Sequence, residues 1–258
     1  MTSTPGINTN PVWTPDGRGI VYRSRSFGGY SLYWIRSDGA AEAVKLVDSK
    51  TDLTPYSLSP DGKRLAYDDQ GGDGGGDIWT LPIDWSDPEH PKAGKPELFL
   101  RTPELERLPA FFSDGNWVAY AAGERVTPDI YVRPFPANPS GGKWKISSDG
   151  GTAPVWSPNG HELFFQKITR EALGLGGGIM VVNYTAKDTT FVWEKPRLWS
   201  DHRMSRTTTG KTYDLAPDGK RFAVLEILQE VEQTTDTHVN LLLNFTDELR
   251  RRVPIGGK

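Results

Sequence analysis

A short pattern that recurs five times constrains the fold more than any other feature of this 258-residue chain. Each copy contains a bulky apolar residue, a turn built on Pro-Asp-Gly or a close variant, and an alternating apolar stretch. The copies read PVWTPDGRGIVY (11–22), YSLSPDGKRLAY (56–67), PAFFSDGNWVAY (109–120), PVWSPNGHELFF (154–165) and YDLAPDGKRFAV (213–224). Aligned on Pro15, Pro60, Ser113, Pro158 and Pro217, they lie 45, 53, 45 and 59 residues apart. The spacing predicts repeated structural units.

Each position of the pattern has a physical reason. Pro fixes φ at the start of a tight turn, Asp or Asn caps its own backbone, and Gly accepts a positive φ. The residues after the turn alternate, as in Arg64 to Tyr67, which indicates a strand. The pattern is therefore a β-hairpin, and a period near 50 residues is typical of the four-stranded blades of a β-propeller. Two positions before the anchor, a bulky apolar residue is expected to face a neighbouring blade: Trp13, Leu58, Phe111, Trp156 and Leu215.

Two further strands are expected after each hairpin. Third strands are predicted at 30–37, 77–84, 129–136, 178–185 and 238–245, and fourth strands at 43–49, 96–102, 143–149 and 196–202. The last unit has no obvious fourth strand, since 246–254 reads as a short helical turn or an irregular strand. The predicted fold is all-β: one propeller domain over 1–258, with units starting near 10, 55, 108, 153 and 212 and four antiparallel strands per blade.

Composition excludes several classes of protein. The net charge of −3 provides no basic surface for nucleic acid or an anionic membrane. With no Cys in the chain, disulfides, thiolate metal sites and Cys nucleophiles are excluded. The N-terminus lacks the basic and apolar regions of a signal peptide, and no apolar run is long enough to span a bilayer. We therefore expect no nucleic-acid partner and no membrane insertion.

The repeated turn resembles that of the TolB-like propellers, whose WD-like repeats carry a Pro-Asp-Gly turn. More narrowly, the chain resembles the propeller attached to bacterial serine/threonine kinases, particularly acidobacterial ones, in GINTNPVWTPDGR (6–18), DIWTLP (77–82), DIYVRPFP (129–136), GGKWKISSDGGTAPVWSPNG (141–160) and LNFTDELRRRVP (243–254). The resemblance implies a sensor domain that is a fragment or relative of such a protein, and an extracytoplasmic location if a kinase-linked parent exists. No Gly-rich phosphate loop or His-Arg-Asp catalytic loop of a kinase is present.

The resemblance also raises the question of how the ring closes. TolB-like propellers usually have six or more blades, and only five repeats are visible here. The ring closes at five blades, or the N-terminal ten residues complete the last blade, or the chain is an open piece that self-associates as a homo-oligomer through its unpaired edges. Completion by one of the termini is favoured over an open arc.

The residues just upstream of each repeat are the candidate site, because the innermost strand of each propeller blade enters the channel there. The predicted ligand-binding residues are Asn10, Thr54, Glu106, Arg107, Thr152 and Tyr213. Oxygen ligands from Asp52, Glu106 and Asp214 are the candidates for a hard cation such as Ca²⁺. The Gly-Asp run at 68–77 lacks the spacing of a calcium loop and is expected to be an exposed hairpin loop. Trp85 lies in an insertion that a partner is able to touch.

Two classes of function remain open. The leading interpretation is a non-catalytic binding or sensor propeller that recognises a protein, a peptide or a small molecule at its top face, with no cofactor and no catalytic residue. The alternative is a hydrolase with its active site in the channel, acting on lactones, esters or phosphoesters with a divalent metal. A divalent ion held by Asp52, Glu106 or Asp214 would favour the hydrolase.

Overall fold

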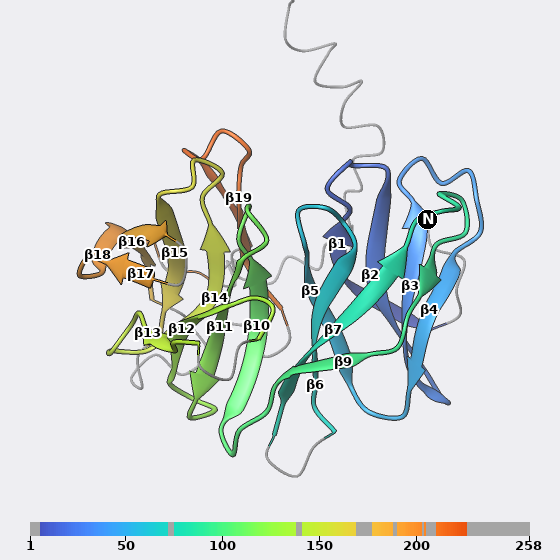
Figure 1. The fold of residues 1–258 in the computed structure, drawn as a ribbon, viewed down its shortest axis with the longest axis horizontal. Coiled ribbons are helices and arrows are strands. Elements are labelled where there is room, and N and C mark those ends of the chain that lie inside the picture. The colour runs from blue at the N-terminus through green and yellow to red at the C-terminus, as the bar shows by residue number, and fades with distance from the viewer. Residues whose placement is uncertain are drawn as a thin grey trace, which may run out of the picture. The chain divides into compact units, whose positions relative to one another are not determined.

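The computed structural model describes residues 6–71, 75–137, 141–168, 177–187, 190–202, 204 and 210–225 (Figure 1). The chain divides into two units, Met1–Glu226 and Ile227–Lys258, and the second lies outside the described residues. The single domain predicted over 1–258 therefore remains a prediction. The segment Met1–Glu226 contains all of the strands reported below.

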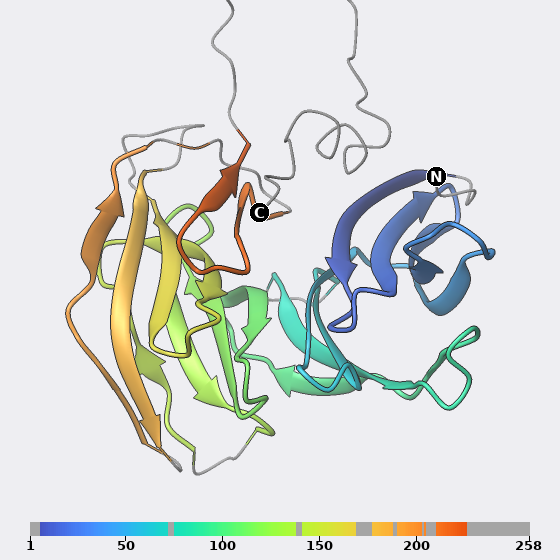
Figure 2. The same cartoon turned by 90° about the horizontal axis from the view of Figure 1, so that it is seen from above.

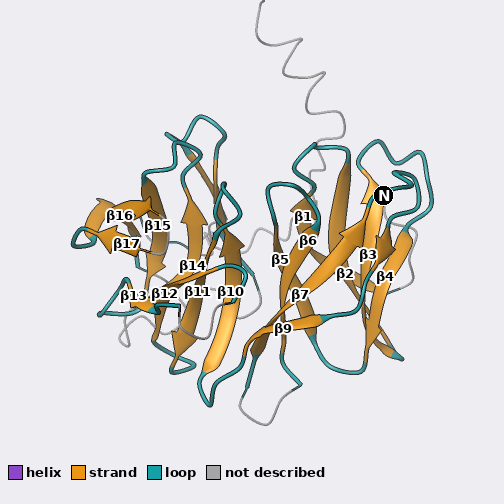
Figure 3. Ribbon diagram, viewed as in Figure 1, coloured by secondary structure: helices purple, strands orange, loops and turns teal. Residues whose placement is uncertain are grey.

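Strands and loops make up the described residues, and no helix occurs among them (Figure 3). The first sheet has the order β1-β2-β3-β4, with β1 Ile7–Trp13, β2 Gly19–Ser26, β3 Gly29–Arg36 and β4 Val44–Ser49. In the second sheet β5 Leu53–Leu58, β6 Arg64–Asp69 and β7 Asp77–Asp84 pair in order, and both β8 Lys92–Ala93 and β9 Glu97–Leu100 pair with β7. All of these pairings are antiparallel.

The next two sheets repeat the same order. The third contains β10 Leu105–Phe111, β11 Trp117–Gly123, β12 Pro128–Pro134 and β13 Trp144–Lys145. The fourth contains β14 Gly151–Trp156, β15 Glu162–Lys167 and β16 Ile179–Lys187, and both β17 Thr190–Trp193 and β18 Arg197–Ser200 pair with β16. A two-stranded sheet of β19 Tyr213–Leu215 and β20 Phe222–Val224 follows. Figure 2 shows the sheets following one another in chain order, from blue through green to orange.

These sheets confirm the predicted all-β fold of four-stranded antiparallel blades. The third strand of the second unit has the predicted bounds, 77–84, and the fourth strand of the third unit is reduced to Trp144–Lys145. The strand predicted at 238–245 and the segment 246–254 lie outside the described residues. Residues Ile7 to Thr9 of β1 pair with β2 in the first sheet, so this part of the N-terminus does not complete the last blade.

The five predicted turns all form in the same way. The turn glycines Gly17, Gly62, Gly115, Gly160 and Gly219 all have φ between 68° and 75°. In each turn the Asp or Asn side chain accepts a hydrogen bond from the backbone N–H two residues later, at 3.0 Å from Arg18 to Asp16 and 2.7 Å from Asn116 to Asp114. The same bond occurs at Asp61, Asn159 and Asp218. These are the interactions that favour Asp, Asn and Gly at such positions.

A bulge occurs at the same position of the first strand in four units, where the pairing with the second strand shifts register. Asn10, Leu108 and Ala153 have φ between 52° and 55° there, which is uncommon for residues other than Gly. Pro55 occupies the equivalent position of the second unit. Such bulges bend and re-aim a strand, and here they lie in the middle of each first strand.

Side chains from neighbouring sheets hold the first strands together. The Trp156 indole donates to the Ala110 carbonyl at 2.9 Å, and the Tyr213 hydroxyl donates to the Ala153 carbonyl at 2.5 Å. Apolar side chains fill the space between sheets, with the first two sharing one core and the third and fourth sharing an aromatic one. Within the described residues no helix is long and apolar enough to cross a membrane.

Candidate ligand-binding cavity

A large cavity lies along the first strands of all five units. Its volume is about 1090 Å³, which is at the upper end of the range for small-molecule sites. The lining is largely aromatic and apolar, and several of the turn prolines belong to it. The lining includes Trp13, Tyr56, Phe112, Trp156, Tyr213 and Leu225.

Trp13 differs from its counterparts in the other units. It lies two residues before the turn anchor, where Leu58, Phe111 and Trp156 are 8–9% exposed because a preceding sheet covers them. Trp13 belongs to the first unit and is 59% exposed. Leu225, on the last described unit, also lines the cavity and is 65% exposed. The cavity thus has large uncovered apolar side chains on two of its walls.

A few polar groups accompany the apolar lining. The Oγ of Ser157 is buried, and no described residue forms a hydrogen bond with it. Lys211 and the exposed Asp214 supply one charge of each sign, and Asn10 contributes an amide. A mainly apolar cavity with a few polar groups is the usual composition of a binding site.

A buried charged cluster lies behind the cavity wall. Arg23 on β2 places its Nη1 2.6 Å from Oδ1 of Asp52 and 3.2 Å from Oγ1 of Thr54. Its Nε donates to Oγ1 of Thr9, which lines the cavity. The side chains of Arg23 and Asp52 are 11% and 27% exposed, so the pair is shielded from most of the solvent.

Asp68 on β6 is the most buried acid of the cluster. Burial raises the pKa of its carboxyl to about 8, against the opposing effects of the Tyr56 hydroxyl and the Arg107 guanidinium. Neither carboxyl oxygen has a hydrogen bond of normal geometry from any described residue. Burial also raises the pKa of the Tyr56 hydroxyl, and Tyr56 belongs to the cavity lining. Asp68 is therefore linked to the cavity through Tyr56.

The repeat explains why these groups meet. Thr9 pairs with Arg23 across the first hairpin, and Thr54 pairs with Asp68 across the second. Arg107 and Thr152 hold the same position in the third and fourth hairpins, opposite Ala121 and Gln166. The same position of the first strand therefore carries a polar side chain in four neighbouring blades: Thr9, Thr54, Arg107 and Thr152.

The predicted ligand-binding residues separate into two groups. Asn10 and Tyr213 line the large cavity. Thr54, Arg107 and Thr152 are buried behind it. Glu106 is buried and accepts hydrogen bonds from the backbone and the hydroxyl of Thr102. Its burial raises the pKa of the Glu106 carboxyl.

The three predicted metal ligands lie in different surroundings. Asp52 pairs with Arg23, Glu106 bonds to Thr102, and Asp214 is exposed at the cavity. In the part of the chain that the structure describes, no group of three or more Asp, Glu and His side chains is arranged to hold a metal ion. Metal binding at these residues remains a prediction.

The structure corrects one expectation from the sequence and adds contacts to another. Asp68 and Asp77 of the Gly-Asp run are strand residues and buried, so the two ends of that run are not an exposed loop, and residues 72–74 lie outside the described residues. Trp85 lies in the predicted insertion, where its indole packs edge-on against Trp34 at 5.9 Å and its Nε1 donates to the Gly62 carbonyl at 2.9 Å, and its contact with a partner remains a prediction.

Sequence reasoning missed Arg23, Asp68 and Gln166. A signal was present, because each directly follows the aromatic residue of the second strand, at Tyr22, Tyr67 and Phe165. A charged or amide side chain at the same position of several apolar strands indicates buried polar partners.

Comparisons with known proteins show the fold. No family model matches the chain, and no curated protein matches it. A putative 6-phosphogluconolactonase from Bacteroides fragilis shares 18% identity at a TM-score of 0.53, over 81% of this chain and 60% of that one.

Two TolB structures are also similar. TolB from Acinetobacter baumannii shares 15% identity at a TM-score of 0.49, over 84% of this chain and 46% of its own. A putative TolB from Agrobacterium tumefaciens shares 15% identity at a TM-score of 0.42, over 87% and 92%. The chain thus spans about half the length of the Acinetobacter protein. The repeated sheets, the five Pro-Asp-Gly-type turns and the likeness at a TM-score of 0.53 together identify the fold of the chain as an all-β propeller.

Proposed function

We propose that this propeller is a non-catalytic binding domain that takes an apolar segment of a partner protein or peptide into the large cavity. The observation that carries the proposal is the exposure of Trp13. Its counterparts Leu58, Phe111 and Trp156 are 8–9% exposed, whereas Trp13 is 59% exposed and lines a cavity of about 1090 Å³. Exposed aromatic anchors beside apolar pockets are typical of protein interfaces.

The polar content of the cavity supports an apolar peptide over a charged ligand. Lys211 and Asp214 oppose each other in sign, so the described lining has no uncompensated charge to attract phosphate or a polycation.

Titration of a panel of fluorescent apolar decapeptides, read by anisotropy, tests the proposal. We expect saturable binding that Trp13→Ala weakens by about tenfold, since a buried aromatic anchor is worth roughly 1–2 kcal/mol or more. Phe27→Ala is the matched control, because Phe27 is fully exposed and lies outside the cavity. Absence of binding, or equal loss in both variants, would contradict the proposal.

The hydrolase alternative is tested on the same protein. A panel of lactones, esters and phosphoesters is assayed with and without a chelator, after metal analysis of the purified chain. We expect no turnover. Turnover that a chelator abolishes and one added ion restores would replace the binding proposal by the hydrolase.

A further inference from the structure

A second cavity lies between the first two turns. Its volume is about 790 Å³, and it is formed by the turn at 14–19, the end of β3 and the turn at 60–63. The segment after β7 closes it through Trp85, Pro88 and Glu89. None of the residues assigned above to ligand binding belongs to it. It shares only Pro15 and Pro60 with the lining of the large cavity.

Two indoles form the apolar part of this cavity. Trp34 and Trp85 pack edge to face, with ring centroids 5.9 Å apart and an angle of 71° between their planes. Trp85 is fixed by its hydrogen bond to Gly62. Trp34 is 2% exposed, and no described residue accepts a hydrogen bond from its Nε1. Gly19 lies against this nitrogen, since a Cβ there would be 2.1 Å from it.

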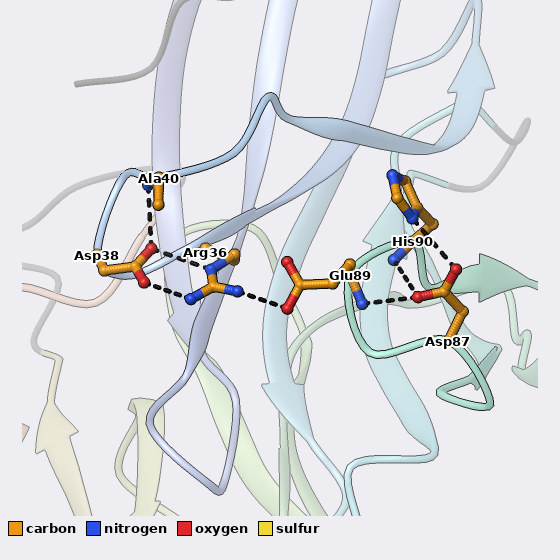
Figure 4. A network of polar contacts seen from close by, with 6 residues as sticks. All are labelled: Arg36, Asp38, Ala40, Asp87, Glu89 and His90. Atoms are coloured by element: carbon orange, nitrogen blue, oxygen red, sulfur yellow. Dashed lines mark hydrogen bonds and ion pairs between the residues drawn. The ribbon is translucent and has the colours of Figure 1, made fainter.

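Charged side chains surround the indoles, and most of them are already paired. Arg36 lies between two acids, with its Nη2 2.5 Å from Oδ2 of Asp38 and its Nη1 2.5 Å from Oε1 of Glu89 (Figure 4). The Glu89 backbone N–H donates to Asp87 at 3.0 Å, which holds this segment in its turn. Asp87 also bonds His90 in the same network.

The turns at 14–19 and 60–63 add two acids, Asp16 and Asp61, that are also held by hydrogen bonds. Asp16 accepts from the Thr14 hydroxyl and the Arg18 N–H, and these bonds lower the pKa of its carboxyl. Asp61 accepts equivalent bonds from Ser59 and Lys63. The lining thus carries three cationic and four anionic side chains in close mixture.

The two indoles and the mixed charges together favour one class of ligand. Neighbouring opposite charges leave little net field, so a phosphate or a polycation has no advantage there. Carboxylates retain lone pairs after one or two bonds, and guanidinium and ammonium groups retain N–H donors. Such a rim matches a ligand whose hydroxyls both donate and accept, while the indoles match its apolar C–H faces. We propose that this cavity binds an uncharged saccharide.

The orphan Nε1 of Trp34 adds a preference within that class. A buried donor without a partner is uncommon and calls for an acceptor. An N-acetyl group provides an amide carbonyl for it and a methyl group for the indole faces. The proposal therefore favours N-acetylated sugars over plain glucose polymers.

Calorimetric titration of the whole chain with the tetramer of N-acetylglucosamine tests the site, with cellotetraose as the second probe. Saturable binding of either supports the saccharide class, and tighter binding of the acetylated probe supports the role of Trp34. We expect Trp34→Phe to weaken the acetylated probe by up to about tenfold through loss of one hydrogen bond. Trp79→Phe is its control, because the Trp79 Nε1 is likewise buried without a described partner but lies outside this cavity.

A matched pair of surface lysine variants tests the site without depending on whether the tryptophan variants fold. Lys63 and Lys220 occupy the same position of the Pro-Asp-Gly-Lys turn, both are exposed, and Lys63 alone lines this cavity. Lys63→Ala is expected to weaken saccharide binding several-fold and Lys220→Ala to leave it unchanged. No saturable binding of either probe, equal effects of the two lysine variants, or tighter binding of a sulfated oligosaccharide than of the neutral ones would overturn the proposal.

Discussion

Arg23 of the first unit lies 2.6 Å from Asp52 of the second, measured from Nη1 to Oδ1. The same guanidinium bonds Thr9 on its own sheet and Thr54 on the next. One side chain therefore connects two neighbouring sheets at the level of their first strands, behind the wall of the large cavity.

Loss of this connection is expected to destabilise the protein. Arg23→Gln leaves the carboxylate of Asp52 largely shielded from water and without its charged partner, which costs about 2–3 kcal/mol. Urea unfolding monitored by near-UV circular dichroism measures this as a lower midpoint with an unchanged slope. Lys45→Gln, which removes an exposed pair with Asp48, serves as the control and should shift the midpoint little. Equal shifts for both variants would show that Arg23 has no special role.

Asp68 is expected to make the stability depend on pH in an unusual direction. Its folded-state pKa of about 8 lies above the ordinary value near 3.9, so the folded protein holds this proton more tightly than the unfolded chain. The stabilisation is fully present below about pH 4 and is lost as pH rises towards 8, by up to about 1.4 kcal/mol per pH unit.

Asp68→Asn removes this dependence. Between pH 5 and pH 8, roughly the window between the two pKa values, the difference in unfolding free energy between wild type and variant should change steadily in favour of the variant. Arg23, Asp52, Tyr56 and Arg107 act on the same carboxyl and are left intact. A difference that stays constant with pH would show that the Asp68 carboxyl is ionised in the folded protein.

The repeated turn gives a test of backbone strain without any change of packing. Gly17 has a φ of 71°, and a Cβ at this position would have no other atom within 4 Å, so Gly17→Ala costs only the left-handed backbone, about 1 kcal/mol. Gly28 has no positive φ, and a Cβ there would meet only the Ser26 Oγ at 3.9 Å, an ordinary contact, so Gly28→Ala should leave thermal unfolding nearly unchanged. A stabilising effect of Gly17→Ala would contradict this assignment of the turn.

The fold was predictable because the turn chemistry is local. Asp16 and Gly17 determine their hairpin through bonds to residues within a few positions, and the same holds in all five copies. Short outer strands were less predictable, as at Trp144–Lys145, because pairing at a sheet edge depends on the neighbouring strand more than on local sequence.

The candidate site was only partly predictable. Asn10 and Tyr213, predicted from their place just upstream of the repeats, line the large cavity, and their role in ligand binding remains a prediction. The sequence did not reveal that Thr54 and Arg107 would be buried, because burial depends on side chains from the neighbouring sheets. The exposure of Trp13 was also hidden, since its sequence position is the same as that of the buried Trp156.

The accessibility of position 13 in the whole chain most directly tests the claim that an open apolar cavity binds a peptide. The chain has no Cys, so Trp13→Cys and Phe27→Cys each introduce a single thiol whose reaction with a maleimide reports exposure at one site. We predict that the thiol of Trp13→Cys reacts about as fast as that of Phe27→Cys and becomes protected when a bound apolar peptide fills the cavity. A thiol at position 13 that is already protected in the peptide-free chain, while the one at position 27 reacts freely, would contradict an open binding cavity.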